Sequence, residues 1–134
     1  MDHSLNEIAS TLRKAGRGAG LDDGTADDIA RAAACAVAAG HDGFRWALEA
    51  LDEPERAGAL VTAADLRAAG EAVDAPLSPL FPYLAEYDDA PRHGAFAVEP
   101  ELWTKALALA HRTYVPASEV SRLAGAGAGT SDND

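Results

Sequence analysis

The apolar residues of this chain recur at the spacing of amphipathic helices, and alanine supplies much of the apolar content. The first such stretch places five apolar residues on one helical face: Leu5, Ile8, Ala9, Leu12 and Ala15. Only 6% of the residues are aromatic although 48% are hydrophobic, so small side chains must fill much of the interior. Small side chains let helices approach closely, and we therefore expect tight helix contacts rather than a roomy cavity.

Capping signals divide the chain into short helices. Three pairs have the spacing at which side chains cap a helix start: Ser4 with Glu7, Thr25 with Asp28, and Thr62 with Asp65. The third pair predicts that a helix from Pro54 to Leu60 ends before another begins at Ala63. A weak strand pattern covers residues 95–98.

These patterns predict a mainly α fold, a compact single-domain bundle of short helices over residues 1–124. One domain is the expectation for 134 residues. Pro76, Pro79 and Pro82 make the middle of the chain proline-rich and irregular. Residues 125–134 form a glycine-rich, acidic tail, which we expect to be flexible unless a ligand or partner holds it.

The charge balance excludes two classes of partner. The chain has 11 lysines and arginines against 22 aspartates and glutamates, a formal net charge of −11. Its cations are scattered along the sequence, whereas nucleic-acid binding needs clustered cations. An acidic surface repels anionic membranes, and the longest apolar run, residues 32–39, is too short to span a bilayer. We therefore expect neither a nucleic acid nor a membrane as partner.

Cysteine usage and the N-terminus favour the cytoplasm. Cys35 is the only cysteine, which rules out an intrachain disulfide and fits a reducing compartment. Residues 1–4 lack the basic and apolar regions that open a secretory signal. We expect a soluble cytoplasmic protein.

One eight-residue pattern, Arg-x-Ala-Gly-x-Gly-Ala-Gly, occurs near both ends of the chain, at residues 13–20 and 122–129. Glycine runs leave backbone N–H groups uncovered, and arginine adds fixed positive charge. The combination predicts a site for a small anion. The predicted anion-binding residues are Arg17, Gly18, Gly20, Ser121, Arg122, Gly125, Gly127 and Gly129.

A structural explanation of both glycine octads stays open. Neither octad is a phosphate loop of a nucleotide-binding fold, because no predicted strand precedes it. A helix C-cap followed by a flexible connector explains the same residues in an alanine-rich chain.

Polar groups before the second octad are candidates for catalysis. If Ala117 starts a helix, Ser118, Ser121 and Arg122 share one face, which suits a small acid. Tyr114 would act as proton donor, so Tyr114 and Ser118 are the predicted catalytic residues. The alternative is capping by Ser118 and core packing by Tyr114.

The sequence predicts no metal site and identifies no cofactor. No spacing typical of metal ligands relates the four histidines, His3, His41, His93 and His111. Asp132 and Asp134 have the chemistry to ligate a hard cation, but a solvated tail is the favoured interpretation. Cys35 is expected to be an inert buried thiol, and Lys14 falls on a solvated helix face.

The two ends of the chain together resemble a bacterial family called domain of unknown function 3726. Residues 4–7, Ser-Leu-Asn-Glu, followed by the first octad, resemble its opening. Its ending is matched by four segments: Thr-Tyr-Val-Pro-Ala-Ser-Glu at 113–119, Ser-Arg at 121–122, Gly-Ala-Gly-Ala-Gly at 125–129 and Asp-Asn-Asp at 132–134. The chain looks like a shortened form of that family, with a shorter middle. The resemblance implies no known reaction.

A second similarity covers less of the chain. Residues 26–30 and 40–43 are similar to the N-terminal helices of the malate and L-lactate dehydrogenase family that is distinct from the Rossmann enzymes. The serine–histidine pair of that family is absent, because Phe44 follows Gly43. At most the N-terminal helices are shared with that family.

Two functions remain from these patterns. The first is a small metabolic enzyme or enzyme subunit, which binds a small carboxylate or phosphate substrate between its two glycine-rich ends. The second is a non-catalytic helical partner, or accessory subunit, which inserts its glycine-rich tail into a larger protein. The partners to expect are thus a small anionic ligand, another protein or a second copy of the chain.

Overall fold

The computed structural model describes residues 2–73, 78–85 and 94–112. Six helices and two short strands make up this part of the chain: β1 (Asp2–Ser4), α1 (Leu5–Gly18), α2 (Asp23–Ala38), α3 (Gly43–Leu51), α4 (Pro54–Ala68), α5 (Phe81–Ala85), β2 (Ala95–Ala97) and α6 (Pro100–His111). The mainly helical, compact fold predicted from the sequence is therefore confirmed.

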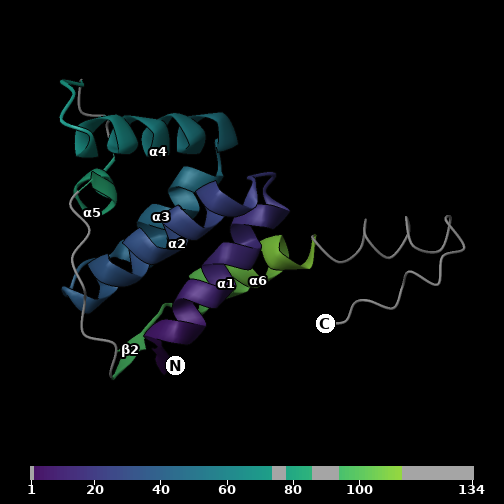
Figure 1. Ribbon diagram of the computed structural model, residues 1–134. Helices are drawn as coiled ribbons and strands as arrows, with labels where there is room; N and C mark the ends of the chain where they lie inside the picture. The colour runs from purple at the N-terminus through teal and green to yellow at the C-terminus, as the bar shows by residue number, and fades with distance from the viewer. Residues whose placement is uncertain (1, 74–77, 86–93, 113–134) are drawn as a thin grey trace, which may run out of the picture.

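Helix α1 packs between α2 and α6 (Figure 1). It contacts α2 on one side and α6 on the other, and α3 packs against α2. Helix α4 crosses one end of this group, with the short α5 beneath it, and both contact α2. The first and last described helices thus lie side by side, although they are far apart in the sequence.

The start of α1 is the capping box expected from the sequence. The Ser4 hydroxyl accepts a hydrogen bond from the Glu7 amide at 3.1 Å, and the Glu7 carboxylate accepts one from the Ser4 amide at 3.1 Å. The bond from the Ser4 amide favours the charged carboxylate, so it lowers the pKa of Glu7.

Two predicted helix boundaries are wrong. Helix α2 begins at Asp23, and its cap is Asp22, whose carboxylate accepts a hydrogen bond from the Thr25 amide at 2.7 Å. Helix α4 runs without a break through Thr62. Serine, threonine and aspartate cap only where the chain turns, and here the apolar face of α4 continues past Thr62 with Ala64 buried.

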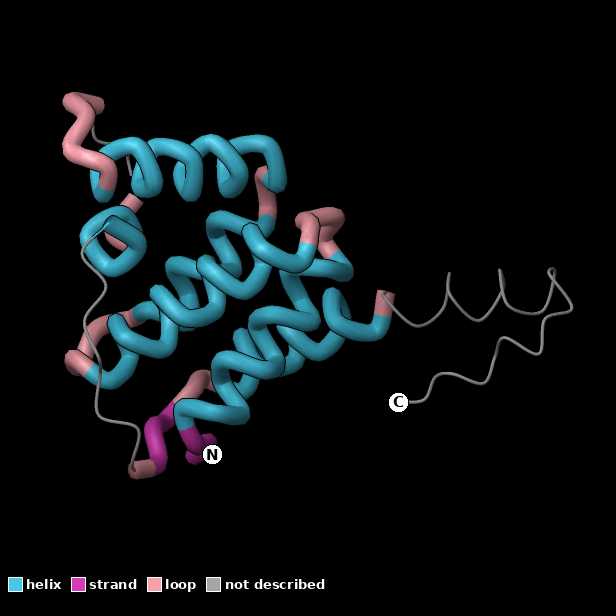
Figure 2. Tube along the Cα trace, viewed as in Figure 1, coloured by secondary structure: helices cyan, strands magenta, loops and turns pink. Residues whose placement is uncertain are grey.

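A two-stranded sheet joins the start of the chain to the segment before α6 (Figure 2). β1 and β2 are antiparallel, with His3 opposite Phe96. The sequence indicated β2 but not β1, because the Asp-His-Ser of β1 contains none of the apolar residues that mark a strand. The His3 ring stacks on Trp103 of α6, with the ring centroids 3.5 Å apart, so the sheet and the stack hold α6 against α1.

The core has the small side chains and close helix contacts expected from the sequence, but the expectation of no roomy cavity is not met, because pockets of about 270 and 230 Å³ lie beside α4. Many of its buried residues are alanines, from Ala15 in α1 to Ala106 in α6. The largest fully buried side chains are few: Ile8, Leu12, Ile29, Leu48 and Leu80. Helices that meet through alanine methyl groups can lie close together.

Candidate functional site

Two of the three glycines of the first octad, Gly16 and Gly18, are packing residues in α1. A Cβ atom on Gly16 would lie 2.9 Å from the Cβ of Ala26 in α2. A Cβ atom on Gly18 would overlap the Leu109 carbonyl of α6 and lie 3.4 Å from the Cβ of Arg112. Glycine is therefore needed here for the close approach of α1 to both neighbouring helices.

The backbone amides that follow α1 donate to carbonyls of the same helix. The Ala19 amide donates to the Ala15 carbonyl at 2.9 Å, and the Gly20 and Leu21 amides donate to Arg17 and Gly16 at 3.0 Å. Gly20 has a φ of +108°, in the region that glycine favours at helix ends. An anion at this end of α1 must therefore be held by side chains rather than by these amides.

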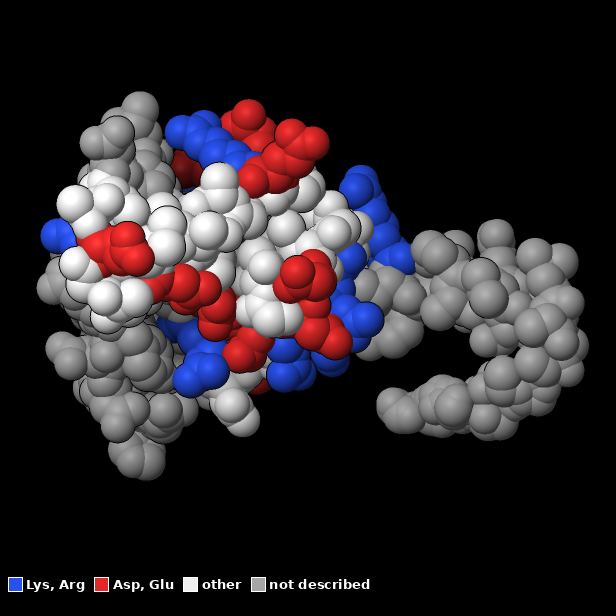
Figure 3. Space-filling view, turned by 45° about the horizontal axis from the view of Figure 1, so that its top comes forward, with Lys and Arg blue, Asp and Glu red and all other residues white. Residues whose placement is uncertain are grey.

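Basic side chains surround the same helix end. Arg13, Lys14 and Arg17 lie on the last turns of α1 and are exposed. Arg112 follows α6 directly and lies beside Gly18. We name these four residues the cationic end. Figure 3 shows basic side chains gathered at the end of the body where the described chain stops.

The cationic end differs in its pairing from most of the other described basic residues; the exception is Arg67, which lies over the Phe81 ring and has no carboxylate partner in the part of the chain that the structure describes. Arg17 binds Asp23 at 2.9 Å, but Arg13, Lys14 and Arg112 have no ion pair within the described ranges. Four other cations are paired with carboxylates: Arg31, Arg45, Arg56 and Lys105. In a chain of net charge −11, three cations without acidic partners on or next to two helices that contact each other are a feature that the sequence did not reveal.

The remaining predicted site residues lie outside the described residues. These are the catalytic candidates Tyr114 and Ser118 and the anion-binding candidates Ser121, Arg122, Gly125, Gly127 and Gly129. Of the predicted site, the structure thus describes Arg17, Gly18 and Gly20, together at the end of α1.

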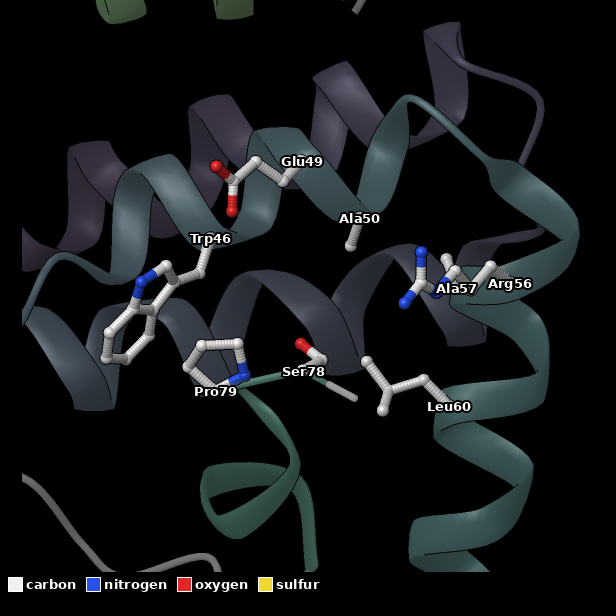
Figure 4. A pocket seen from close by; sticks show the side chains of 8 residues that line it. All are labelled: Trp46, Glu49, Ala50, Arg56, Ala57, Leu60, Ser78 and Pro79. Atoms are coloured by element: carbon white, nitrogen blue, oxygen red, sulfur yellow. The ribbon is translucent and has the colours of Figure 1, made fainter. Parts of the chain in front are cut away.

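A pocket of about 270 Å³ lies between α3, α4 and the segment before α5 (Figure 4). Its apolar lining consists of Trp46, Ala50, Ala57, Leu60 and Pro79, and its polar lining of Glu49, Arg56 and Ser78. These residues come from three separate segments, so no motif in the sequence marks them.

A second cavity, of about 230 Å³, lies between α2, α4 and α5 and is lined by two carboxylates, Asp28 and Asp65. Burial raises the pKa of Asp28, and the negative charges of Asp65 and Asp27 raise it further. The folded chain therefore holds a proton on Asp28 more tightly than the unfolded chain does. The stability that protonation contributes is present below the ordinary pKa of 3.8 and is lost as the pH rises through the raised value.

Asp28→Asn should accordingly raise the free energy of unfolding at pH 7. The gain should stay below the ~1.4 kcal/mol of one full pKa unit, because solvent screens the carboxyl. The gain should shrink as the pH falls toward 4, because the native Asp28 binds its proton more readily than the unfolded chain does. Thermal unfolding at both pH values measures it. The matched control is Asp27→Asn, which removes the 3.1 Å contact with Arg31 and should give no gain. Equal gains in both variants would contradict the assignment to Asp28.

Other sequence expectations can be compared with the described part of the chain. Cys35 is buried, as expected. In these ranges no group of three or more histidine, cysteine, aspartate or glutamate side chains is placed to hold a metal ion. Nor does any helix there have the length and apolar character needed to cross a membrane.

Comparison with known proteins finds one relationship. The family model described as Protein of unknown function (DUF3726) matches residues 3–73. The match includes the first octad and continues through α4, further into the chain than the opening motif alone. No curated protein and no solved structure matches this chain.

Proposed function

This chain belongs to the family Protein of unknown function (DUF3726), and from its own residues we propose that it binds a small carboxylate or phosphate at the cationic end. In this proposal it acts as a metabolic enzyme or an enzyme subunit. The observation that carries the proposal is the contact of Gly18 with Leu109 and Arg112. That contact places the first octad beside the residue from which the chain continues to Tyr114 and the second octad.

The order of residues after Arg112 supports a shared site. Tyr114 follows Arg112 by two residues and Ser118 by six, and Arg122 of the second octad follows by ten. We propose that Arg122 joins the cationic end in holding the anion, with Tyr114 or Ser118 nearest the reacting atoms. Tyr114 would supply a proton to the bound group.

The charges at this place suit an anion. Guanidinium groups bind carboxylate and phosphate through paired N–H donors. The carboxyl ends of α1 and α6 meet here, and the negative ends of their dipoles favour nearby cations. The side chains, and not the helix ends, therefore supply the attraction for an anion.

The test is the affinity of the full chain for inorganic phosphate and for succinate, measured by isothermal titration calorimetry. At least one of the two probes, phosphate or succinate, should bind the native chain. Arg112→Ala and Arg122→Ala should each weaken the binding of that probe about tenfold, the effect of one charge-assisted contact. Arg67→Ala is the control, because it removes the same charge from α4, where Arg67 lies over Phe81. Equal losses in all three variants would mean that only net charge matters and would contradict the site.

The alternative, a non-catalytic helical partner, has less support. The described residues include two large exposed apolar side chains, Leu66 and Leu107. They lie on different helices, and isolated exposed leucines are ordinary in monomers. Deletion of residues 125–134 would support this alternative if it weakened a complex while the helical body stayed folded.

A further inference from the structure

We propose that the pocket between α3 and α4 is a second binding site, which takes a small zwitterion with an apolar side chain, the chemistry of an apolar α-amino acid. This inference does not depend on the cationic end. It rests on the size of the pocket, on its apolar lining and on one side chain of each charge at its rim.

The apolar part of the pocket suits a short hydrocarbon side chain. Ala57 and Leu60 of α4 are buried at its floor, 1% and 3% exposed, and the half-buried Trp46 stands at one end (Figure 4). Pro79 faces them from the segment before α5. A volume of about 270 Å³ is many times what a single water needs, which is room for a molecule the size of an amino acid.

The polar part carries both signs of charge. Glu49 and Arg56 lie on either side of Ala50, with Arg56 at the end opposite Trp46 (Figure 4). Glu53 binds the Arg56 guanidinium at 3.1 Å and fixes its position at the rim. Ser78 lies between them on the opposite wall, where its hydroxyl accepts a hydrogen bond from the Leu80 amide at 3.2 Å.

Charge complementarity selects the ligand. A simple anion would pair with Arg56 but meet the Glu49 carboxylate, and a simple amine would have the reverse conflict. An uncharged apolar molecule would displace water from both charged groups without offering them hydrogen bonds in its place. A zwitterion would bring its ammonium to Glu49 and its carboxylate to the Arg56 guanidinium, which it would share with Glu53, while its side chain lies against Trp46 and Leu60.

The test is a titration of the full-length chain with L-leucine, followed by the indole N–H signals in NMR spectra. The chain has two tryptophans: Trp46 lines the pocket, and Trp103 is stacked on His3 and serves as the internal control. The Trp46 signal should shift and saturate while the Trp103 signal stays constant. L-leucinamide and N-acetyl-L-leucine, which each lack one charge, should bind about tenfold more weakly.

Two variants assign the charges. Arg56→Gln should weaken L-leucine binding about tenfold and leave the affinity for L-leucinamide unchanged. Glu49→Gln should weaken L-leucine binding similarly and leave the affinity for N-acetyl-L-leucine unchanged. Glu101→Gln on α6 and Arg67→Gln in the last turn of α4 make the same changes at residues that do not line the pocket, and both variants should bind L-leucine as the native chain does.

Three results would overturn the proposal. One is the absence of a Trp46 shift at any L-leucine concentration up to saturation of the solution. Another is equal affinity for L-leucine, L-leucinamide and N-acetyl-L-leucine, which would show that the pocket binds apolar groups without recognising either charge. The last is a shift of both indole signals together. None of these results would bear on phosphate binding at the cationic end.

Discussion

Gly18→Ala should lower the free energy of unfolding by about 3 kcal/mol, the upper part of the range for overpacking a tight contact. The added methyl group would overlap the Leu109 carbonyl, and a backbone carbonyl cannot turn away as a flexible side chain can. Helix α6 would have to move off α1, with loss of the stacked His3 and Trp103 rings. Urea unfolding followed by circular dichroism measures the change.

Gly58→Ala is the matched control for this substitution. Gly58 lies within α4, and a Cβ atom there would meet nothing within 4 Å. Alanine favours the helix by roughly 0.5–1 kcal/mol over glycine, so this variant should be more stable than the native chain. If Gly18→Ala were equally stabilising, the close contact of α1 with α6 would be refuted.

Leu12→Ala should cost about 3 kcal/mol or more, as for buried leucines that leave a cavity. Leu12 is 1% exposed in the middle of α1. The core cluster around it is rich in alanine, whose single methyl group cannot extend to fill the space. Few large side chains stabilise this fold, so the loss of one removes a large share of its buried apolar surface.

The control for Leu12 is the same change at Leu107, which is 40% exposed on α6. Leu107→Ala should change the free energy of unfolding by less than about 1 kcal/mol, because little buried surface is lost. Thermal unfolding of both variants compares them directly. A similar loss of stability in both would contradict the assignment of the core.

The sequence predicted the helices well, because each has an apolar face and α1 has a complete capping box. The prediction was wrong where a polar residue can either cap a helix or lie inside one. Thr62 and Asp65 have capping spacing but lie inside a continuous helix, and Thr25 receives a cap from Asp22 instead of providing one. Whether a threonine caps or continues a helix depends on the packing of the flanking turns, which spacing alone does not contain.

The candidate site was predicted less completely, for a physical reason. The first octad was recognised as a unit, but its glycines meet Ala26 and Leu109 across helix contacts that only the packing of the helices creates. The same contact places Arg112 beside Gly18 at the end of α1. The pocket at Trp46 combines three chain segments, so its residues could be grouped only after the path of α4 was known.

The most direct test of the account is a titration of the ¹⁵N-labelled full chain with inorganic phosphate, with the backbone amide signals followed by NMR. Signals from residues 13–18, 109–112 and 122–129 should shift together with one dissociation constant, because both octads contribute to one anion site. Shifts confined to one of these segments, or centred on the pocket at Trp46, would contradict the claim that the two glycine-rich ends share a ligand.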